Sequence, residues 1–172
     1  MKNINTDINE LIIKIADEII QSNTDLSQIL LVGILTRGYP IAQRIADLIK
    51  KKKKQEVPVG KLDITLYRDD LEIKKNMLNL KETLIPVNIE NKTVILVDDV
   101  LYHGRTVRAA IEHLLDYGRP KKIQLAVLVD RGHRELPVCG DYIGLTIKTE
   151  INDTVQVKLA ETDGVDKIVK NG

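Results

Sequence analysis

The chain has 172 residues, of which 43% are hydrophobic and 30% charged, and its formal net charge is +1. This composition favours one globular domain over 1–172 and gives no global attraction to nucleic acid or membranes. A single cysteine, Cys139, excludes a disulfide within the chain and fits a reducing, cytoplasmic setting. Residues 1–6 lack the apolar run of a signal peptide, and no apolar run is long enough to span a bilayer.

Apolar residues at helical spacing predict a helix that begins after Asp7, and a buried strand at 29–35 follows a polar break. A loop then leads into a second helix over 41–49, which ends in the lysine run 50–54, a favourable charge for a helix C-terminus. Further along, the pattern predicts strands at 59–67, 93–97, 123–129, 142–147 and 155–159 and a helix at 105–115. The polar stretch 68–90 has the length typical of a lid or binding loop.

Buried apolar strands that alternate with amphipathic helices indicate an α/β fold with a mostly parallel sheet covered on both faces. Ligands bind at the carboxyl ends of the strands in such folds. The informative loops therefore follow strands, at 36–40, 98–106 and 130–137.

The strongest signal is the segment 94–106, which reads VILVDDVLYHGRT. It predicts a buried strand that delivers two adjacent carboxylates to the sheet edge, then a short loop with Gly104 and a helix start near Thr106. Vicinal ribose hydroxyls suit the carboxylates, which only accept hydrogen bonds. Backbone amides and the positive end of a helix dipole suit a phosphate. A sugar phosphate would satisfy both halves, whereas the alternative is an ordinary strand–loop–helix with a capping aspartate pair.

These 13 residues resemble the motif by which type I phosphoribosyltransferases bind 5-phosphoribosyl-1-diphosphate (PRPP). Four further segments resemble one family within that class: VGILTRG at 32–38, LDITLYRDD at 62–70, GRP at 118–120 and LAVLVDRGHRELP at 125–137. That family is PyrR, in which pyrimidine-operon attenuation and uracil phosphoribosyltransferase activity are combined. The resemblance covers nearly the whole chain, and its most specific part is 130–137.

The resemblance implies the type I phosphoribosyltransferase fold, a mostly parallel central sheet flanked by helices with a small hood formed by the N-terminal and C-terminal segments. It also implies formation of UMP and diphosphate from uracil and PRPP. Mg²⁺ would arrive with the diphosphate, since this ion prefers phosphates and waters to full protein cages. Family members commonly form homodimers or larger assemblies.

The resemblance assigns roles to individual residues. Asp98 and Asp99 would hold the ribose hydroxyls, and Arg37 would offset charge on the leaving diphosphate. The implied PRPP site comprises Thr36, Arg37, Gly38, Asp98, Asp99, Val100, Leu101, Tyr102, His103, Gly104, Arg105 and Thr106, with Asp98, Asp99 and Arg37 as catalytic residues. A mobile loop would begin at Tyr67, Arg68 and Asp69, and the base would lie near Arg131 and Val155.

Some of these assignments have simpler alternatives. Arg37 can be a surface arginine beside a glycine turn, and Arg68 can form an ordinary surface ion pair. No metal-ligand cluster is visible in the sequence, because His103, His113 and His133 lack the necessary spacing.

The RNA-binding half of the resemblance is weaker. Alignment by the flanking motifs puts Asp17, Cys139 and Leu145 where RNA-binding members carry His, Arg and Lys, although Lys14 and Arg134 remain basic. Each lost cation removes a phosphate contact. The chain also has no Trp or Phe and only five Tyr, which leaves little material for stacking bases.

The sequence therefore leaves three alternative functions. The first is a uracil phosphoribosyltransferase, and the second is an RNA-binding attenuator that uses PRPP and UMP only as effectors. The third is a purine phosphoribosyltransferase of the same fold, against which the segment 130–137 argues.

His103 stands where the family usually has Thr, a small hydroxyl donor. Near its unperturbed pKa of about 6.5, imidazole can bind phosphate as a cation, or it can crowd the loop. We predict that PRPP affinity is retained but varies with pH. An affinity that is flat from acid to mildly basic pH, measured by calorimetric titration, would show that His103 is not a phosphate ligand.

Overall fold

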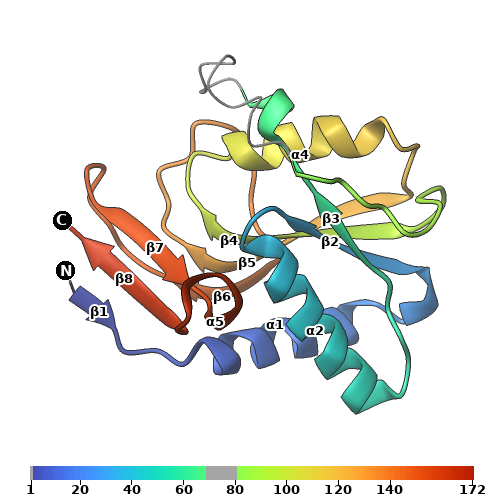
Figure 1. Ribbon diagram of the computed structural model, residues 1–172, viewed down its shortest axis with the longest axis horizontal. Helices are drawn as coiled ribbons and strands as arrows, with labels where there is room; N and C mark the ends of the chain where they lie inside the picture. Colours follow the sequence, from blue (N-terminus) through green and yellow to red (C-terminus); the bar gives the residue numbers. More distant parts are fainter. Residues whose placement is uncertain (1, 69–80) are drawn as a thin grey trace.

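The computed structural model describes residues 2–68 and 81–172 and is built around a five-stranded parallel sheet. The strands are β2 (Ile29–Ile34), β3 (Val59–Leu62), β4 (Thr93–Leu101), β5 (Lys122–Asp130) and β6 (Tyr142–Thr146), in the order β3-β2-β4-β5-β6. β4 therefore lies at the centre, where it places its carboxyl end between those of β2 and β5 (Figure 1). This arrangement confirms the expected parallel sheet.

Helices cover both faces of this sheet. α1 (Ile8–Ser22) and α2 (Gly38–Lys53) lie on one face, and α4 (Arg105–Leu115) lies on the other (Figure 1). Because side chains alternate across a strand, Leu31 joins the core under α1 and α2 while Leu30 joins the core under α4. Asp7 caps α1, as expected, by accepting a hydrogen bond from the Asn9 N–H.

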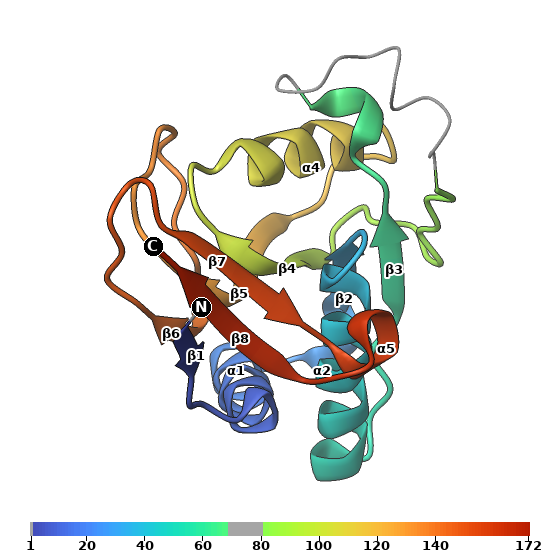
Figure 2. The ribbon, with the colours of Figure 1, turned by 60° about the vertical axis from the view of Figure 1, so that its left-hand side comes forward.

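A second, antiparallel sheet is formed by both ends of the chain. It contains β1 (Lys2–Ile4), β7 (Thr154–Lys158) and β8 (Lys167–Asn171) in the order β1-β8-β7, and the short helix α5 (Ala160–Asp163) joins β7 to β8. The two termini lie beside each other at this sheet in both ribbon views (Figures 1 and 2). We call it the hood. That 1–172 is one domain remains a prediction.

Two predicted strands differ from the structure. The strand expected at 59–67 ends at Leu62, because the Asp63 carboxylate accepts from the N–H and hydroxyl of Thr65 and the chain turns into a short 3₁₀ helix, η2 (Thr65–Tyr67). The strand expected at 93–97 continues to Leu101, so both acids lie within the strand. A further 3₁₀ turn, η1 (Leu26–Gln28), precedes β2.

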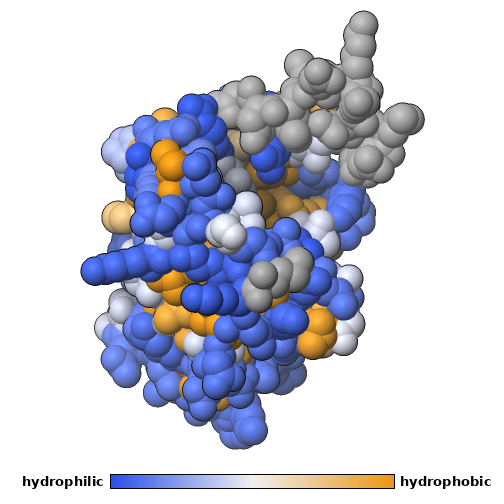
Figure 3. Space-filling model, turned by 90° about the vertical axis from the view of Figure 1, so that its left-hand side faces the viewer, coloured by the Kyte–Doolittle hydropathy of each residue, from blue (hydrophilic) through white to orange (hydrophobic). Residues whose placement is uncertain are grey.

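The face that carries the hood is mostly hydrophilic, with apolar residues exposed in patches (Figure 3). In the described parts of the chain, no helix combines the length and apolar character needed to cross a membrane.

Candidate active site

Two adjacent carboxylates line a cavity at the carboxyl end of β4. Asp98 is 8% exposed, and its Oδ1 accepts a hydrogen bond from the Asp99 N–H at 2.9 Å, while Asp99 Oδ1 accepts from the Val100 N–H at 2.8 Å. The cavity is about 210 Å³ and is lined by Ile34, Leu35, Thr36, Arg37, Ile64, Arg68, Asp98, Asp99, Val100 and Thr106. Asp98 is therefore screened from bulk water and Asp99 is half-buried, and both face a space that a ligand can enter.

The electrostatics of the pair favour a ligand that donates hydrogen bonds. Burial raises the pKa of Asp98 well above its usual value, and the neighbouring Asp99 raises that pKa further. Burial also raises the pKa of Asp99, although the charge of Arg37 opposes this shift. Ligand hydroxyls or a cation at this position would replace the hydration that the carboxylates have lost.

The turn after β4 presents backbone donors to an adjoining cavity. Gly104 has φ of +92°, a conformation that favours glycine, and α4 begins at the next residue. None of the hydrogen bonds found among the described residues uses the N–H of Tyr102, His103 or Gly104. Residues 100–107 and Arg68 surround a cavity of about 130 Å³. The amides and the helix N-terminus together suit a phosphate.

Arg134 holds the carbonyl groups of this turn. Its guanidinium donates to the carbonyl oxygens of Tyr102 (2.7 Å), Gly132 (3.0 Å) and Val138 (3.0 Å) and to the Asp130 carboxylate (2.5 Å). In addition, the His103 carbonyl accepts from two N–H groups, at residues 135 and 136. The segment 130–138 behind the turn thus donates to the carbonyl oxygens of the turn and leaves the N–H groups of the turn unused. Arg134 is one of the two positions that remain basic in the comparison with RNA-binding members, and in the structure its donors are engaged at this turn.

The turn that contains Thr36 and Arg37, and the first residue of α2, Gly38, lie beside the acid pair. A Cβ on Gly38 would stand 2.1 Å from the Val97 carbonyl oxygen, so only glycine permits this approach. Arg37 forms a two-bond pair with Asp163, with Nε–Oδ2 at 3.0 Å and Nη2–Oδ1 at 2.7 Å. Arg37 is therefore a paired residue next to the acids, and sequence reasoning missed its partner in α5.

The residues expected around the base lie in two places. The Arg131 guanidinium carbon is 3.8 Å from the centre of the Tyr102 ring, and its nitrogens donate to the Thr149 hydroxyl and the Glu150 carbonyl. Val155 lies in β7 of the hood and packs against the core. A role for either in binding the base stays a prediction.

Of the residues expected to begin the mobile loop, the structure describes Tyr67 and Arg68. The Tyr67 ring stacks on His113 with ring centres 4.3 Å apart, and its carbonyl accepts from Arg108 at 2.6 Å. Arg68 lines both cavities at the acid pair and the turn. Asp69 lies outside the described residues.

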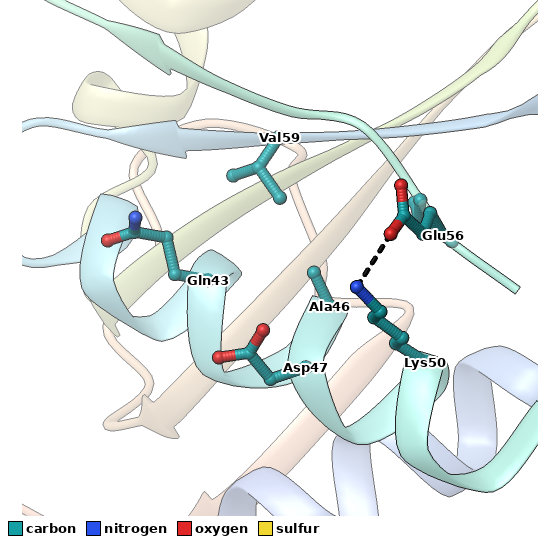
Figure 4. Close-up of a pocket in the computed structure, with 7 residues that line it drawn as sticks. Gln43, Ala46, Asp47, Lys50, Glu56 and Val59 are labelled. Carbon is teal, nitrogen blue, oxygen red and sulfur yellow. Dashed lines mark hydrogen bonds and ion pairs between the residues drawn. The ribbon is translucent and has the colours of Figure 1, made fainter. Parts of the chain in front are cut away.

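Another cavity, of about 250 Å³, lies between α2 and the chain that enters β3 (Figure 4). Lys50 and Glu56 form an ion pair at its edge, with Nζ and Oε1 2.6 Å apart. No residue of the 94–106 segment lines it, so it shares nothing with the site at β4.

Comparisons with known proteins show the family of the chain. The family of phosphoribosyl transferase domains matches residues 2–162. The chain is 50% identical over 163 residues to the bifunctional protein PyrR of Chloroflexus aurantiacus, which covers 95% of this chain and 90% of that protein. It is 52% identical over 155 residues to the bifunctional protein PyrR of Thermus aquaticus, which covers 90% and 86%.

The chain belongs to the PyrR family. Among solved structures, the hypoxanthine phosphoribosyltransferase of Trypanosoma cruzi matches with a TM-score of 0.70 over 98% of this chain and 95% of that chain. At 17% identity this likeness shows the fold alone. The expected family and the type I phosphoribosyltransferase fold are thus confirmed.

We predict that Asp98→Asn stabilises the ligand-free protein at neutral pH. A carboxyl whose pKa is raised on folding binds more protons in the native state than in the unfolded state. The free energy of unfolding therefore falls as the pH rises from the ordinary pKa to the raised one. Asn removes this charge and keeps an oxygen to accept from the Asp99 N–H.

Urea unfolding at pH 7 and pH 5 measures the effect, and the gain should shrink at the lower pH. Asp163→Asn is the matched control with the opposite sign, because its hydrogen bonds with Arg37 hold the pKa of Asp163 far below its usual value. A destabilised Asp98→Asn at pH 7 would contradict the account of the buried charge.

Proposed function

We propose that the chain transfers the phosphoribosyl group of PRPP to uracil, which yields UMP and diphosphate. The observation that carries the proposal is the pair Asp98–Asp99 beside a turn with unused amides, in two cavities that share Arg68, Val100 and Thr106. Membership of the PyrR family supports uracil as the base.

In this proposal the ribose lies over β4. The carboxylates of Asp98 and Asp99 accept hydrogen bonds from the two ribose hydroxyls, because ionised carboxylates have acceptors only. The amides of Tyr102, His103 and Gly104 donate to the 5-phosphate at the N-terminus of α4. The sugar is thereby held at both ends, which fixes the position of its anomeric carbon.

The reaction breaks the bond from the anomeric carbon to the diphosphate oxygen and forms one from that carbon to a uracil ring nitrogen, whose proton is released with the diphosphate. The sugar gains oxocarbenium character between these events, and the buried carboxylates stabilise that positive charge. Thr36 and Arg37 line the same cavity and suit the departing diphosphate. Positioning, charge and exclusion of water carry the rate, with no covalent intermediate on the protein.

The residues at the site fit a magnesium ion that arrives with the diphosphate. Among residues 2–68 and 81–172, no group of three or more His, Cys, Asp or Glu is arranged to hold a metal. Asp98 and Asp99 are the acidic residues in the lining of this cavity, so an ion here would keep waters and phosphate oxygens as most of its ligands. When bound, the ion neutralises charge on the diphosphate.

We propose that this reaction takes place in the cytoplasm, because a single cysteine, which cannot form a disulfide within the chain, fits a reducing compartment. That the chain forms a homodimer or a larger homo-oligomer stays a prediction.

The attenuator function is a second candidate, because the relatives are named bifunctional. The contacts of the basic side chains favour this function less than the transferase. Lys14 Nζ donates to the carbonyls of Ile143 and Gly144, Arg134 is engaged at the turn, and Asp17 forms an ion pair with Lys52 at 2.5 Å. Few cations are left at the positions on which RNA binding in the family depends.

A two-substrate assay tests the enzyme. With PRPP and Mg²⁺, we expect UMP formation from uracil and much slower conversion of hypoxanthine. Asp99→Asn should reduce turnover greatly without unfolding the chain, since one carboxylate for the ribose is lost. Faster turnover with hypoxanthine would favour a purine enzyme, and a fully active Asp99→Asn would refute the ribose-binding role.

Binding of labelled pyrimidine-operon leader RNA tests the second candidate. We expect weak or absent binding at moderate salt, because lost cations reduce the phosphate contacts. Tight, sequence-selective binding that UMP modulates, together with negligible turnover, would instead establish the chain as a regulator.

A further inference from the structure

Lys81, which belongs to the polar stretch 68–90, brings a cation to the diphosphate side of the site. Its Nζ lies 2.5 Å from the Thr36 hydroxyl, although the two residues are 45 positions apart in the chain. Thr36 lines the cavity that also contains Asp98 and Asp99. The ammonium group is therefore next to the wall of that cavity where the leaving group would lie.

The hydrogen bond between these side chains also orients Thr36. An ammonium group only donates, so the Thr36 oxygen is the acceptor and its own hydrogen is free to point elsewhere. Two N–H groups of Lys81 remain for other acceptors. Together the two side chains have several unused donors, which suits a phosphate group.

The local charge balance favours a cation here in addition to Arg68, which lines the same cavity. Asp98 and Asp99 repel a diphosphate, and the charge of Arg37 is shared with Asp163. Among residues 2–68 and 81–172, no carboxylate forms an ion pair with Lys81. A positive charge at this edge offsets the repulsion that the acid pair would otherwise impose on the leaving group.

Asp63 determines where Lys81 lies. This residue is 9% exposed, and its carboxylate accepts from the Lys81 N–H at 2.5 Å and from the Thr65 N–H and hydroxyl at 2.9 and 2.5 Å. Its own N–H donates to the Thr83 hydroxyl, and its carbonyl oxygen lies 2.7 Å from His113 Nδ1. Asp63 thus ties residues on both sides of 69–80 to the end of β3.

The titration of Asp63 agrees with this contact. Burial alone would raise its pKa, but the hydrogen bonds from Thr65 and Lys81 outweigh burial and the net pKa is lowered. The carboxylate is therefore charged, and it holds the Lys81 backbone strongly at neutral pH.

We propose that Lys81 is a diphosphate-binding residue of the transferase, and that Asp63 is the positioning residue that places it against Thr36. This inference rests on the proposed phosphoribosyl transfer and adds a binding residue to it. The alternative is that the Lys81–Thr36 contact only stabilises the loop.

Calorimetric titration of the full chain with three ligands in Mg²⁺ separates these roles: PRPP, inorganic diphosphate and UMP. For Lys81→Gln we expect affinity for PRPP and diphosphate to fall about tenfold or more, the loss typical of one charge-assisted hydrogen bond. Affinity for UMP should not change, because UMP has no diphosphate. Lys81→Arg should retain most of the diphosphate affinity.

Lys61→Gln is the matched control, because it removes the same charge from β3, where Lys61 pairs with Glu82 at 3.0 Å. Asp63→Asn should weaken diphosphate binding, and in the double variant with Lys81→Gln the loss should not exceed that of Lys81→Gln alone. Thermal unfolding of each variant verifies that it is folded.

The outcomes are distinct. If wild type binds PRPP and Lys81→Gln binds diphosphate equally well, or loses UMP affinity to the same degree, the inference is wrong and the proposed function stands. If wild type binds neither PRPP nor UMP, the proposed function itself fails.

Discussion

Burial of two neighbouring carboxylates is the constraint on which the rest of the site depends. Asp98 and Asp99 lie within the central strand, and desolvation raises the pKa of both. Such an arrangement opposes folding unless a ligand or a nearby cation compensates. Arg37, which Asp163 keeps in position, compensates part of this charge, and Gly38 allows the start of α2 to approach β4 closely. The open cavity before the acids is where ribose hydroxyls would supply the remaining compensation.

The orientation of the turn after β4 is the second requirement. A peptide group whose carbonyl oxygen is bound elsewhere in the protein still has its N–H available. Here Arg134 donates to the Tyr102 carbonyl. The N–H groups of Glu135 and Leu136 donate to the His103 carbonyl. The segment 130–138 therefore acts through backbone geometry. An arginine that looks like a surface cation in the sequence serves to pre-organise a phosphate site.

Local patterns in the sequence were sufficient for the sheet, the three main helices and the acid-and-turn segment. Each depends on periodicity or on contiguous residues, as in 94–106. The partners of Arg37, Arg134 and Thr36 were not predictable in this way, since Arg37–Asp163 and Thr36–Lys81 join residues 126 and 45 positions apart. The hood strand β1 has three residues, too few for a period, and β3 ends early because Asp63 captures Thr65.

The central claim is that the acids and the amides of the turn together form a cup for a phosphorylated ribose. Amide NMR shifts during titration with ribose 5-phosphate test it directly, with 2-deoxyribose 5-phosphate as the comparison. The account predicts large shifts at Tyr102, His103 and Gly104 with both sugars, and weaker binding of the deoxy sugar because Asp98 and Asp99 lose a hydroxyl partner. Shifts confined to other parts of the chain, or equal affinity for the two sugars, would contradict it.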